Sequence, residues 1–233
     1  MWSKVFEREL HHFLGGMSVT GWIGHFLAVG VFGVAVPLRQ GLDFLDVMFL
    51  LAYACLPCLF AAPLVAESVA GRKTQPPAEG YIAQVVTPFI FATIWSLLIL
   101  SSAIAAVNAA NWYGKVILPP RAILWNVVLL SLAATAFASA ITGWLALNVA
   151  SATMAKSHAR RLFLLVLLAV LMYARMAPDT WKRVVESRLT ADGITWILLP
   201  LSIALLGLAA LLVRAGAGRR AEEAAGPVFS LRS

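Results

Sequence analysis

Six charge-poor apolar stretches follow one another along this chain, separated by short polar segments. They cover residues 13–38, 47–66, 85–107, 122–152, 162–177 and 193–213. A helix needs about 20 mostly apolar residues to cross roughly 30 Å of hydrocarbon, and each stretch reaches or nearly reaches that length. The pattern therefore predicts an all-α integral membrane protein with six transmembrane helices.

The composition agrees with this fold class. Of the 233 residues, 61% are hydrophobic and 12% are charged, which is far from the average of water-soluble domains. Residues 1–215 are expected to form a single transmembrane domain. Residues 216–233, rich in Ala, Gly, Arg and Glu, are expected to form a flexible cytoplasmic tail. The stretch 162–177 is the weakest span, because Arg175 must extend its side chain to the outer interface.

The positions of Lys and Arg predict the orientation. With six spans both termini lie on one side, and eleven of the eighteen basic residues fall on that side. They are Lys4, Arg8, Arg72, Lys73, Lys156, Arg160, Arg161, Arg214, Arg219, Arg220 and Arg232. The positive-inside rule then makes both termini cytoplasmic, in a multi-pass protein of the cell membrane that we expect to be a bacterial inner membrane. The net charge of +7 favours contact with anionic membrane lipids and no nucleic acid.

The first fourteen residues predict an amphipathic helix. Their apolar side chains recur at helical spacing, at Trp2, Val5, Phe6, Leu10, Phe13 and Leu14. Charged residues and histidines fall mainly on the other side. We expect residues 1–14 to lie flat on the cytoplasmic surface as an interfacial helix, before the chain turns inward near Gly15 and Gly16.

Motifs for chemistry on phosphates or peptide bonds are missing from the sequence. It contains no G-x-x-x-x-G-K-[ST], H-E-x-x-H or G-x-S-x-G pattern, and all eleven Asp and Glu lie outside the apolar cores of the spans. Cys55 and Cys58 stand among Leu, Pro and Phe, where a thiol acts as a small apolar group. We therefore expect no catalytic residue, cofactor or metal of the chain's own.

Few polar side chains lie within the predicted spans beyond Thr20, His25, Tyr53, Asn126 and Asn148. A conduit with such walls suits an apolar or amphipathic cargo better than a sugar or a metal ion. His25 is the only ionisable group deep in the first span, which makes it a candidate polar residue of a transport pathway. A neutral, hydrogen-bonded packing role is the alternative.

The polar segment after the second span carries a distinctive pattern. Residues 67–79 read E-S-V-A-G-R-K-T-Q-P-P-A-E. The chain here resembles the permeases of the type-2 ABC transporter family, whose second helix leads into an E-S-x-A-G-E-[KR]-E-x-G-T-x-E motif that forms a cytoplasmic coupling helix. The residues that match in register are Glu67, Ser68, Ala70, Gly71, Lys73 and Glu79. Arg72 replaces the usual Glu, and Pro76 and Pro77 replace a Gly-Thr pair.

The resemblance extends along the chain and implies a mode of action. The amphipathic start resembles the family's interfacial helix, and residues 178–192 resemble its extracellular insert. It implies that residues 67–84 form a coupling segment between the second and third helices, and that a separate ATPase (nucleotide-binding) subunit binds ATP and pushes on it. A second permease copy or a paralogue would complete a dimer. The implied ATPase contacts are Glu67, Ser68, Gly71, Arg72, Lys73 and Glu79.

The expected function is therefore that of the permease subunit of an ATP-driven exporter for an apolar or amphipathic substrate. Two other classes remain open. A six-helix scaffold or assembly factor would share the spans and lack a coordinated ATPase. A lipid-modifying membrane enzyme would need His25 and the outer carboxylates Asp43 and Asp46 to converge on one site.

Cysteine labelling tests the predicted topology. The four basic sites Lys4/Arg8, Arg72/Lys73, 156–161 and 214–220 should be cytoplasmic, while Asn111 and Asp179 should face outward. A cysteine at Asn111 should react with an impermeant reagent applied to intact cells, and a cysteine at Thr74 should not. Labelling of Thr74 from outside would contradict the six-span topology.

Overall fold

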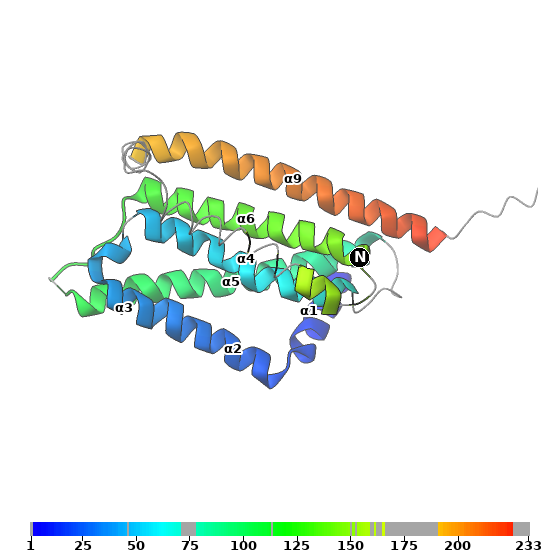
Figure 1. Cartoon of the computed structure of the whole chain (residues 1–233), viewed down its shortest axis with the longest axis horizontal. Helices are drawn as coiled ribbons and strands as arrows, with labels where there is room; N and C mark the ends of the chain where they lie inside the picture. The colour runs from blue at the N-terminus through cyan, green and yellow to red at the C-terminus, as the bar shows by residue number, and fades with distance from the viewer. Residues whose placement is uncertain are drawn as a thin grey trace, which may run out of the picture.

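The computed structural model describes residues 2–45, 47–70, 78–112, 114–149, 153–158 and 191–225, together with residues 151, 161 and 165. Every regular element within these residues is a helix (Figure 1). The elements are α1 Trp2–Gly16, α2 Val19–Gly30, a π-helical turn η1 Val31–Ala35, α3 Val36–Gln40, a 3-10 turn η2 Gly41–Leu45, α4 Val47–Ala70, α5 Ala78–Ala110, α6 Arg121–Leu147 and α9 Ala191–Ala225.

Five helical stretches are long and apolar enough to cross a membrane. They are Val19–Gln40, Tyr53–Ala70, Gly80–Ala110, Arg121–Leu147 and Thr195–Glu222. The prediction of an all-helical protein with several membrane-spanning helices is confirmed in this form. The sixth predicted span, residues 162–177, lies outside the described residues except for Leu165. The predicted insert 178–192 lies outside them as well, apart from its last two residues, which begin α9.

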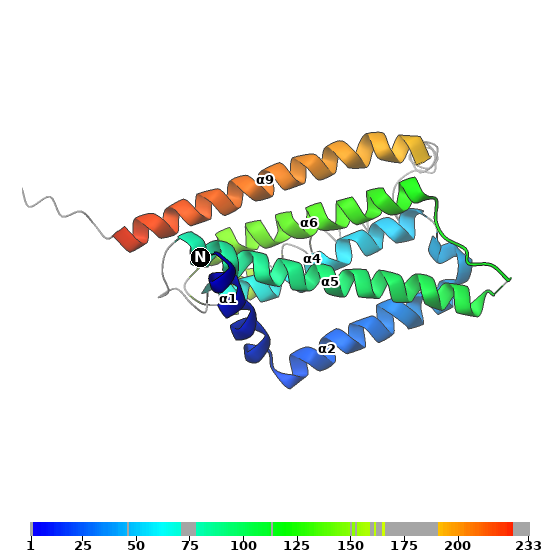
Figure 2. The ribbon, with the colours of Figure 1, turned by 180° about the vertical axis from the view of Figure 1, so that it is seen from behind.

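The long helices lie side by side along the long axis of the molecule. α9 packs on α6, α6 packs on α4, and α4 packs on α5. The α2, η1 and α3 stretch follows α5 on the other side of the bundle (Figures 1 and 2). The start of α1 and the end of α9 lie at the same end of the bundle. We call this end the terminal end and the other the loop end.

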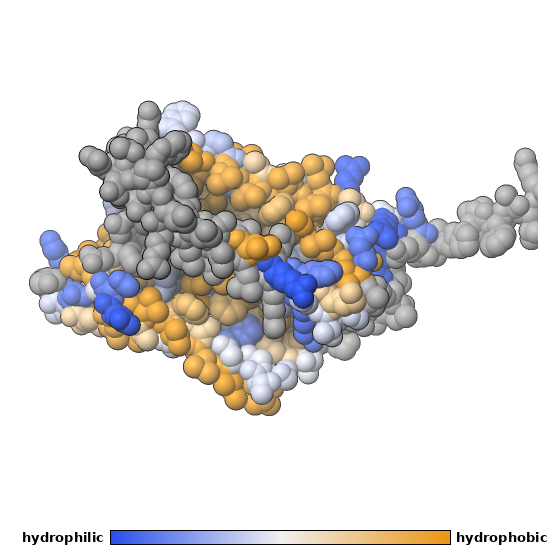
Figure 3. Space-filling view, viewed as in Figure 1, coloured by the Kyte–Doolittle hydropathy of each residue, from blue (hydrophilic) through white to orange (hydrophobic). Residues whose placement is uncertain are grey.

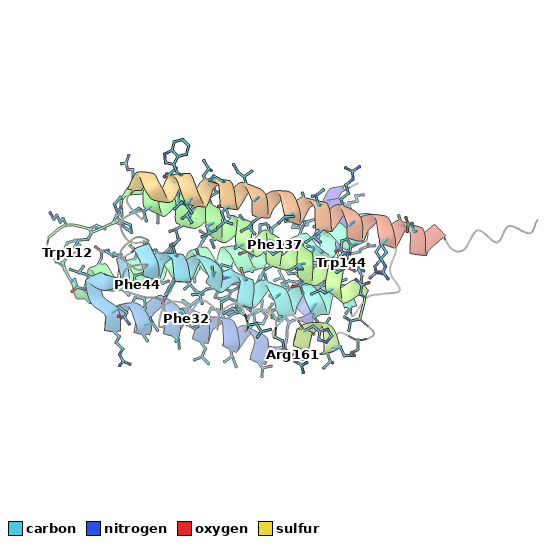
Figure 4. All side chains as sticks on the ribbon, turned by 45° about the horizontal axis from the view of Figure 1, so that its top comes forward. Phe32, Phe44, Trp112, Phe137, Trp144 and Arg161 are labelled. Carbon is cyan, nitrogen blue, oxygen red and sulfur yellow. The ribbon has the colours of Figure 1, made fainter. Side chains whose placement is uncertain are left out.

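The surface of the bundle is apolar along its length. In the visible face of Figure 3 apolar residues follow the helices, and the strongly hydrophilic residues gather mostly toward the two ends. Figure 4 shows Trp144 and Arg161 at the terminal end, and Phe44 and Trp112 at the loop end. Tryptophans near both ends of an apolar belt are typical of membrane proteins, because the indole ring is amphipathic.

The amphipathic helix predicted for residues 1–14 is observed as α1, and it extends two residues further to Gly16. Figure 2 shows α1 turned away from the long axis of the bundle. The chain bends at Met17 and Ser18, where the Ser18 side chain accepts a 3.2 Å hydrogen bond from the Gly21 N–H and so caps the start of α2. The first apolar stretch, predicted as one run over residues 13–38, is therefore divided between two helices.

A π-helical turn interrupts the first membrane-spanning stretch at Val31–Ala35. The Val36 N–H donates to the Val31 carbonyl, five residues earlier. With the same spacing, the Phe32 carbonyl would accept a hydrogen bond from the N–H of the residue after Val36. That position is Pro37, which has no N–H. The Tyr53 hydroxyl of α4 takes its place and donates a 2.7 Å hydrogen bond to the Phe32 oxygen. A distant side chain thus satisfies a carbonyl that the helix leaves open.

Three predicted boundaries are corrected by the structure. The second span continues to Ala70 and the third begins at Ala78, so most of the predicted coupling segment belongs to helix ends. α6 ends at Leu147, whereas the apolar stretch ran to residue 152. The flexible tail predicted from Gly216 is helical through Ala225, because Ala217 and Arg220 are buried against the bundle. Residues 226–233 lie outside the described residues.

The π-helical turn predicts different effects for two Tyr→Phe substitutions. Tyr53→Phe leaves the Phe32 carbonyl unpaired in an apolar environment and should lower the free energy of unfolding by about 1–3 kcal/mol. Tyr81→Phe should have little effect, because the Tyr81 hydroxyl is buried and has no hydrogen-bond partner among the described residues. Both variants are compared by denaturant unfolding in one detergent, and equal losses would contradict the role assigned to Tyr53.

Candidate functional site

The described parts of the predicted coupling segment, residues 67–70 and 78–84, lie at the terminal end of the bundle. Residues 67–70 form the last turn of α4, and residues 78–84 form the first turns of α5. Gly71, Arg72 and Lys73 lie outside the described residues. Glu79 is in the first turn of α5, although its side chain is outside the description. The structure therefore places the two ends of the segment.

Glu67 forms an ion pair with Lys156, which lies in the helical segment 153–158. The Lys156 Nζ is 2.7 Å from the Glu67 Oε2, and the side chains are 31% and 62% exposed. Exposed pairs of this kind contribute little to stability. Most of the Glu67 side chain is thus exposed to solvent at the end of α4, whereas its neighbour Ser68 is buried. The sequence placed Lys156 in a basic cluster but did not reveal this partner.

Arg220 of α9 reaches the end of α4. Its Nη2 lies 3.4 Å from the Val69 carbonyl oxygen, and the residue is only 6% exposed. The last carbonyls of a helix have no partner within that helix, and they carry the negative end of its dipole. The guanidinium group therefore caps α4 at the point where the coupling segment begins. Its neighbour Arg219 donates to the Asn148 Oδ1 just after α6.

Tyr81, in the first turns of α5, lies in a narrow slot between α6 and α9. A Cβ added at Gly143 would come within 2.8 Å of Val85 Cγ2 and 3.0 Å of the Tyr81 oxygen. A Cβ added at Gly216 would come within 2.6 Å of Tyr81 Cε1. A Cβ at Gly216 would overlap the Tyr81 ring, and one at Gly143 would lie too close to Val85 and tightly against the Tyr81 oxygen, so the two glycines allow close packing around this side chain. Tyr81 is 2% exposed.

These contacts surround one buried apolar cluster at the terminal end. It joins the end of α4, the start of α5, the end of α6, the segment 153–158 and α9. Its buried members are Val65, Ala66, Val69, Tyr81, Val85, Ala146, Leu147, Ala155 and Ala217. The sequence analysis missed Tyr81, Gly216 and Arg220, because it assigned residues 216–233 to a flexible tail. The small residues Gly216 and Ala217 were the available signal, since small residues mark close helix packing in membranes.

His25 lies in a separate aromatic cluster. Its Nδ1 is 2.7 Å from the Gly21 carbonyl oxygen, so this nitrogen carries a proton and donates it. Its ring centroid is 5.2 Å from that of Phe91, 5.4 Å from Trp95 and 5.7 Å from Phe60. His25 is 9% exposed, and its Nε2 has no hydrogen-bond partner within the described structure. The structure thus shows it packed among rings of α4 and α5.

Three other polar side chains predicted within the spans, those of Tyr53, Asn126 and Asn148, form hydrogen bonds within the bundle. Asn126 donates to the Ala122 carbonyl and, over 2.8 Å, to the Thr195 hydroxyl of α9. Asn148 donates to the Trp144 carbonyl and accepts from Arg219. Together with the Tyr53 bond to Phe32, these contacts account for three of the five polar side chains. They tie helices together and do not form a continuous polar path.

A small cavity lies between α4, α5 and α6, with a volume of about 20 Å³. Tyr53, Thr93, Ser96 and Ser131 are its polar lining residues. This volume suffices for about one water molecule and is far too small for a transported amphipathic molecule. Within the described ranges, no group of three or more His, Cys, Asp or Glu side chains could hold a metal ion.

Comparison of the chain with protein-family models, with curated proteins and with solved structures found no significant match. The resemblance to the type-2 ABC permeases therefore depends on the residues of this chain alone.

The slot around Tyr81 predicts opposite effects for two Gly→Ala substitutions in α9. Gly216→Ala places a methyl group on the Tyr81 ring and should lower the free energy of unfolding by about 1–3 kcal/mol. Gly218 lies two residues further along α9, and a Cβ added there would meet no atom within 4 Å. Gly218→Ala should therefore leave the free energy of unfolding unchanged or raise it by up to about 1 kcal/mol. Both are measured by denaturant unfolding in detergent. A neutral Gly216→Ala variant would show that α9 does not pack against Tyr81.

Proposed function

We propose that this chain is the membrane-spanning permease subunit of an ATP-driven ABC exporter that moves an apolar or amphipathic substrate. A separate ATPase subunit would bind the nucleotide, and a second permease copy or a paralogue would complete the dimer. One observation carries the proposal. The two ends of the motif-bearing segment, residues 67–70 and 78–84, lie together at the terminal end, where they contact the end of the last helix.

The lengths of the helices support a coupling role for this end. α5 has 33 residues and α9 has 35, which corresponds to about 50 Å each at 1.5 Å per residue. The hydrocarbon core is roughly 30 Å thick, so these helices extend beyond it. Tyr81 and Arg220 lie at the terminal end, which also carries the start of α1 and the end of α9 and which the distribution of basic residues assigns to the cytoplasm. An ATPase could reach the segment there.

The course of the chain supports a sixth crossing. α6 and α9 both run from the loop end to the terminal end (Figure 1). The end of α6 and the start of α9 therefore lie at opposite ends of the bundle. The span predicted at residues 162–177 lies between them in the sequence, and as a membrane crossing it would join these two ends.

The cargo route is proposed to form between two permease copies. The cavity between α4, α5 and α6 has room for about one water molecule, and the side chains of Tyr53, Asn126 and Asn148 are engaged in hydrogen bonds within the chain. A passage for an amphipathic molecule would therefore need a surface outside this bundle. A dimer supplies such a surface.

The scaffold alternative shares the helices and the buried cluster but needs no ATPase. The lipid-modifying alternative needs His25, Asp43 and Asp46 to converge. Asp43 lies in η2 at the loop end, more than a full helical stretch beyond His25. The fifteen residues from position 25 to position 40 alone span about 22 Å. Asp46 lies outside the described residues. The structure therefore does not bring His25 and Asp43 together.

A charge swap distinguishes two roles of Glu67, a contact with the ATPase and the ion pair with Lys156. Glu67→Lys removes the ion pair and would also repel a basic contact on the ATPase, whereas the double variant Glu67→Lys/Lys156→Glu restores an ion pair with reversed polarity. If Glu67 contacts the ATPase, both variants should reduce its recovery with the tagged permease about tenfold or more. Reversal of Arg72 and Lys73 together should do the same.

The readout is the amount of phosphate-loop ATPase that co-purifies from native membranes, identified and quantified by mass spectrometry. Glu7→Lys, an exposed charge reversal on α1, is the matched control and should have no effect. Membrane abundance of each variant controls for folding. Full recovery of the ATPase with the double swap would assign Glu67 to the intramolecular bond alone. Undiminished recovery with every variant would reject the segment as the coupling element.

A further inference from the structure

One turn of α9 touches both ends of the motif-bearing segment. Gly216 and Arg220 are four residues apart, and residues at this spacing lie on one face of a helix. Gly216 contacts the Tyr81 ring at the start of α5. Arg220 contacts the Val69 carbonyl at the end of α4. The last helix in the sequence thus bridges the two helices that the segment connects.

The contact at Arg220 combines charge with burial. At 3.4 Å the hydrogen bond to Val69 is long, so its geometry alone makes it weak. The guanidinium charge, however, faces the negative end of the α4 dipole in a site that is only 6% exposed. Such interactions are stronger in partly buried positions than at an open surface. Arg220 therefore fixes the last turn of α4 to α9.

The contact at Gly216 is steric. The Tyr81 side chain has glycine on two sides: a methyl group at Gly216 of α9 would overlap the ring, and one at Gly143 of α6 would press on the Tyr81 oxygen and on Val85. A close-packed aromatic ring of this kind cannot shift without displacing its neighbours. A movement of the start of α5 must therefore move α9, move α6 or open the slot.

We propose that the α9 turn Gly216–Arg220 is a clamp on the coupling segment, with Arg220 and Tyr81 as its positioning residues. The clamp holds the end of α4 and the start of α5 at a fixed distance from α9. When the segment is displaced, the displacement reaches α9 as well as the two helices it connects. The clamp itself follows from the contacts, whereas its use in transmission depends on the proposed function.

Hydrogen exchange of the purified permease in nanodiscs tests the clamp without any ATPase. Arg220→Met keeps much of the side-chain volume and removes the charge. Amides in peptides covering residues 66–70 and 78–85 should then exchange about tenfold faster, which corresponds to the loss of one hydrogen bond to a charged group. Arg214→Met makes the same substitution at an exposed position six residues earlier in α9. It should leave the exchange rates of both peptides unchanged.

Arg220→Lys provides a second test if the methionine variant is poorly folded. Lysine keeps the charge and loses the planar fork, so it should give an intermediate increase in exchange. Exchange in these peptides that is unchanged in every folded Arg220 variant, or raised equally by Arg214→Met, would overturn the clamp.

The transmission step is tested on the permease purified together with its ATPase. A fluorophore is placed at Glu222→Cys, an exposed position on α9, after Cys55 and Cys58 are replaced by alanine. Adding a non-hydrolysable ATP analogue should shift its emission in the parent and in Arg214→Met. Arg220→Met should still co-purify with the ATPase but lose at least about half of the emission shift. A purely structural role of Arg220 would not reduce the shift while the ATPase stays bound.

An equal shift in Arg220→Met and the parent would overturn transmission through the clamp. If no ATPase co-purifies with the unsubstituted chain, the proposed function fails and transmission fails with it. The exchange measurement then still decides whether the clamp exists, so the two failures are distinguishable.

Discussion

The structure depends on one constraint, that backbone carbonyl and N–H groups surrounded by hydrocarbon must have hydrogen-bond partners. Unbroken helices satisfy it internally, so the difficult places are where a helix ends or changes register. Here distant side chains supply the partners. Tyr53 serves the π-helical turn at Phe32, and Arg220 serves the end of α4. Asn108 binds both the N–H and the carbonyl of Ile117 and so fixes the connection between α5 and α6.

The same contacts decide how the helices pack. A side chain can serve a carbonyl of another helix only when the two backbones approach closely, and glycine permits that approach. Gly33 in the π-helical turn lies against Ile99 and Ser102 of α5, near the bond between Tyr53 and Phe32. Gly143 and Gly216 play this part around Tyr81. The bonds made by Tyr53 and Arg220 are therefore each accompanied by a site where a methyl group would not fit or would fit tightly.

The sequence predicts the helices far better than their contacts. Long apolar runs identify membrane spans because the thickness of the bilayer sets their length, and this requires no knowledge of neighbours. The end of α9 could not be predicted in this way. Gly216, Gly218, Arg219 and Arg220 have the composition of a mobile tail, and contacts with Asn148 and with the more distant Tyr81 and Val69 make that turn part of the bundle. The sequence identifies Lys156 as a basic residue that indicates topology. Its ion pair with Glu67 depends on the packing of distant segments, which local sequence patterns do not encode.

The environment of these bonds differs between a membrane-spanning stretch and the terminal end. The Tyr53 bond to Phe32 lies within a membrane-spanning stretch, so breaking it leaves a carbonyl in surroundings where few groups can replace the hydroxyl. The Arg220 bond to Val69 lies close to the exposed pair Glu67 and Lys156, yet Val69 is fully buried and Arg220 is 6% exposed. A rearrangement of the terminal end must therefore open the contacts around Tyr81 and Arg220 before water can reach the released carbonyl.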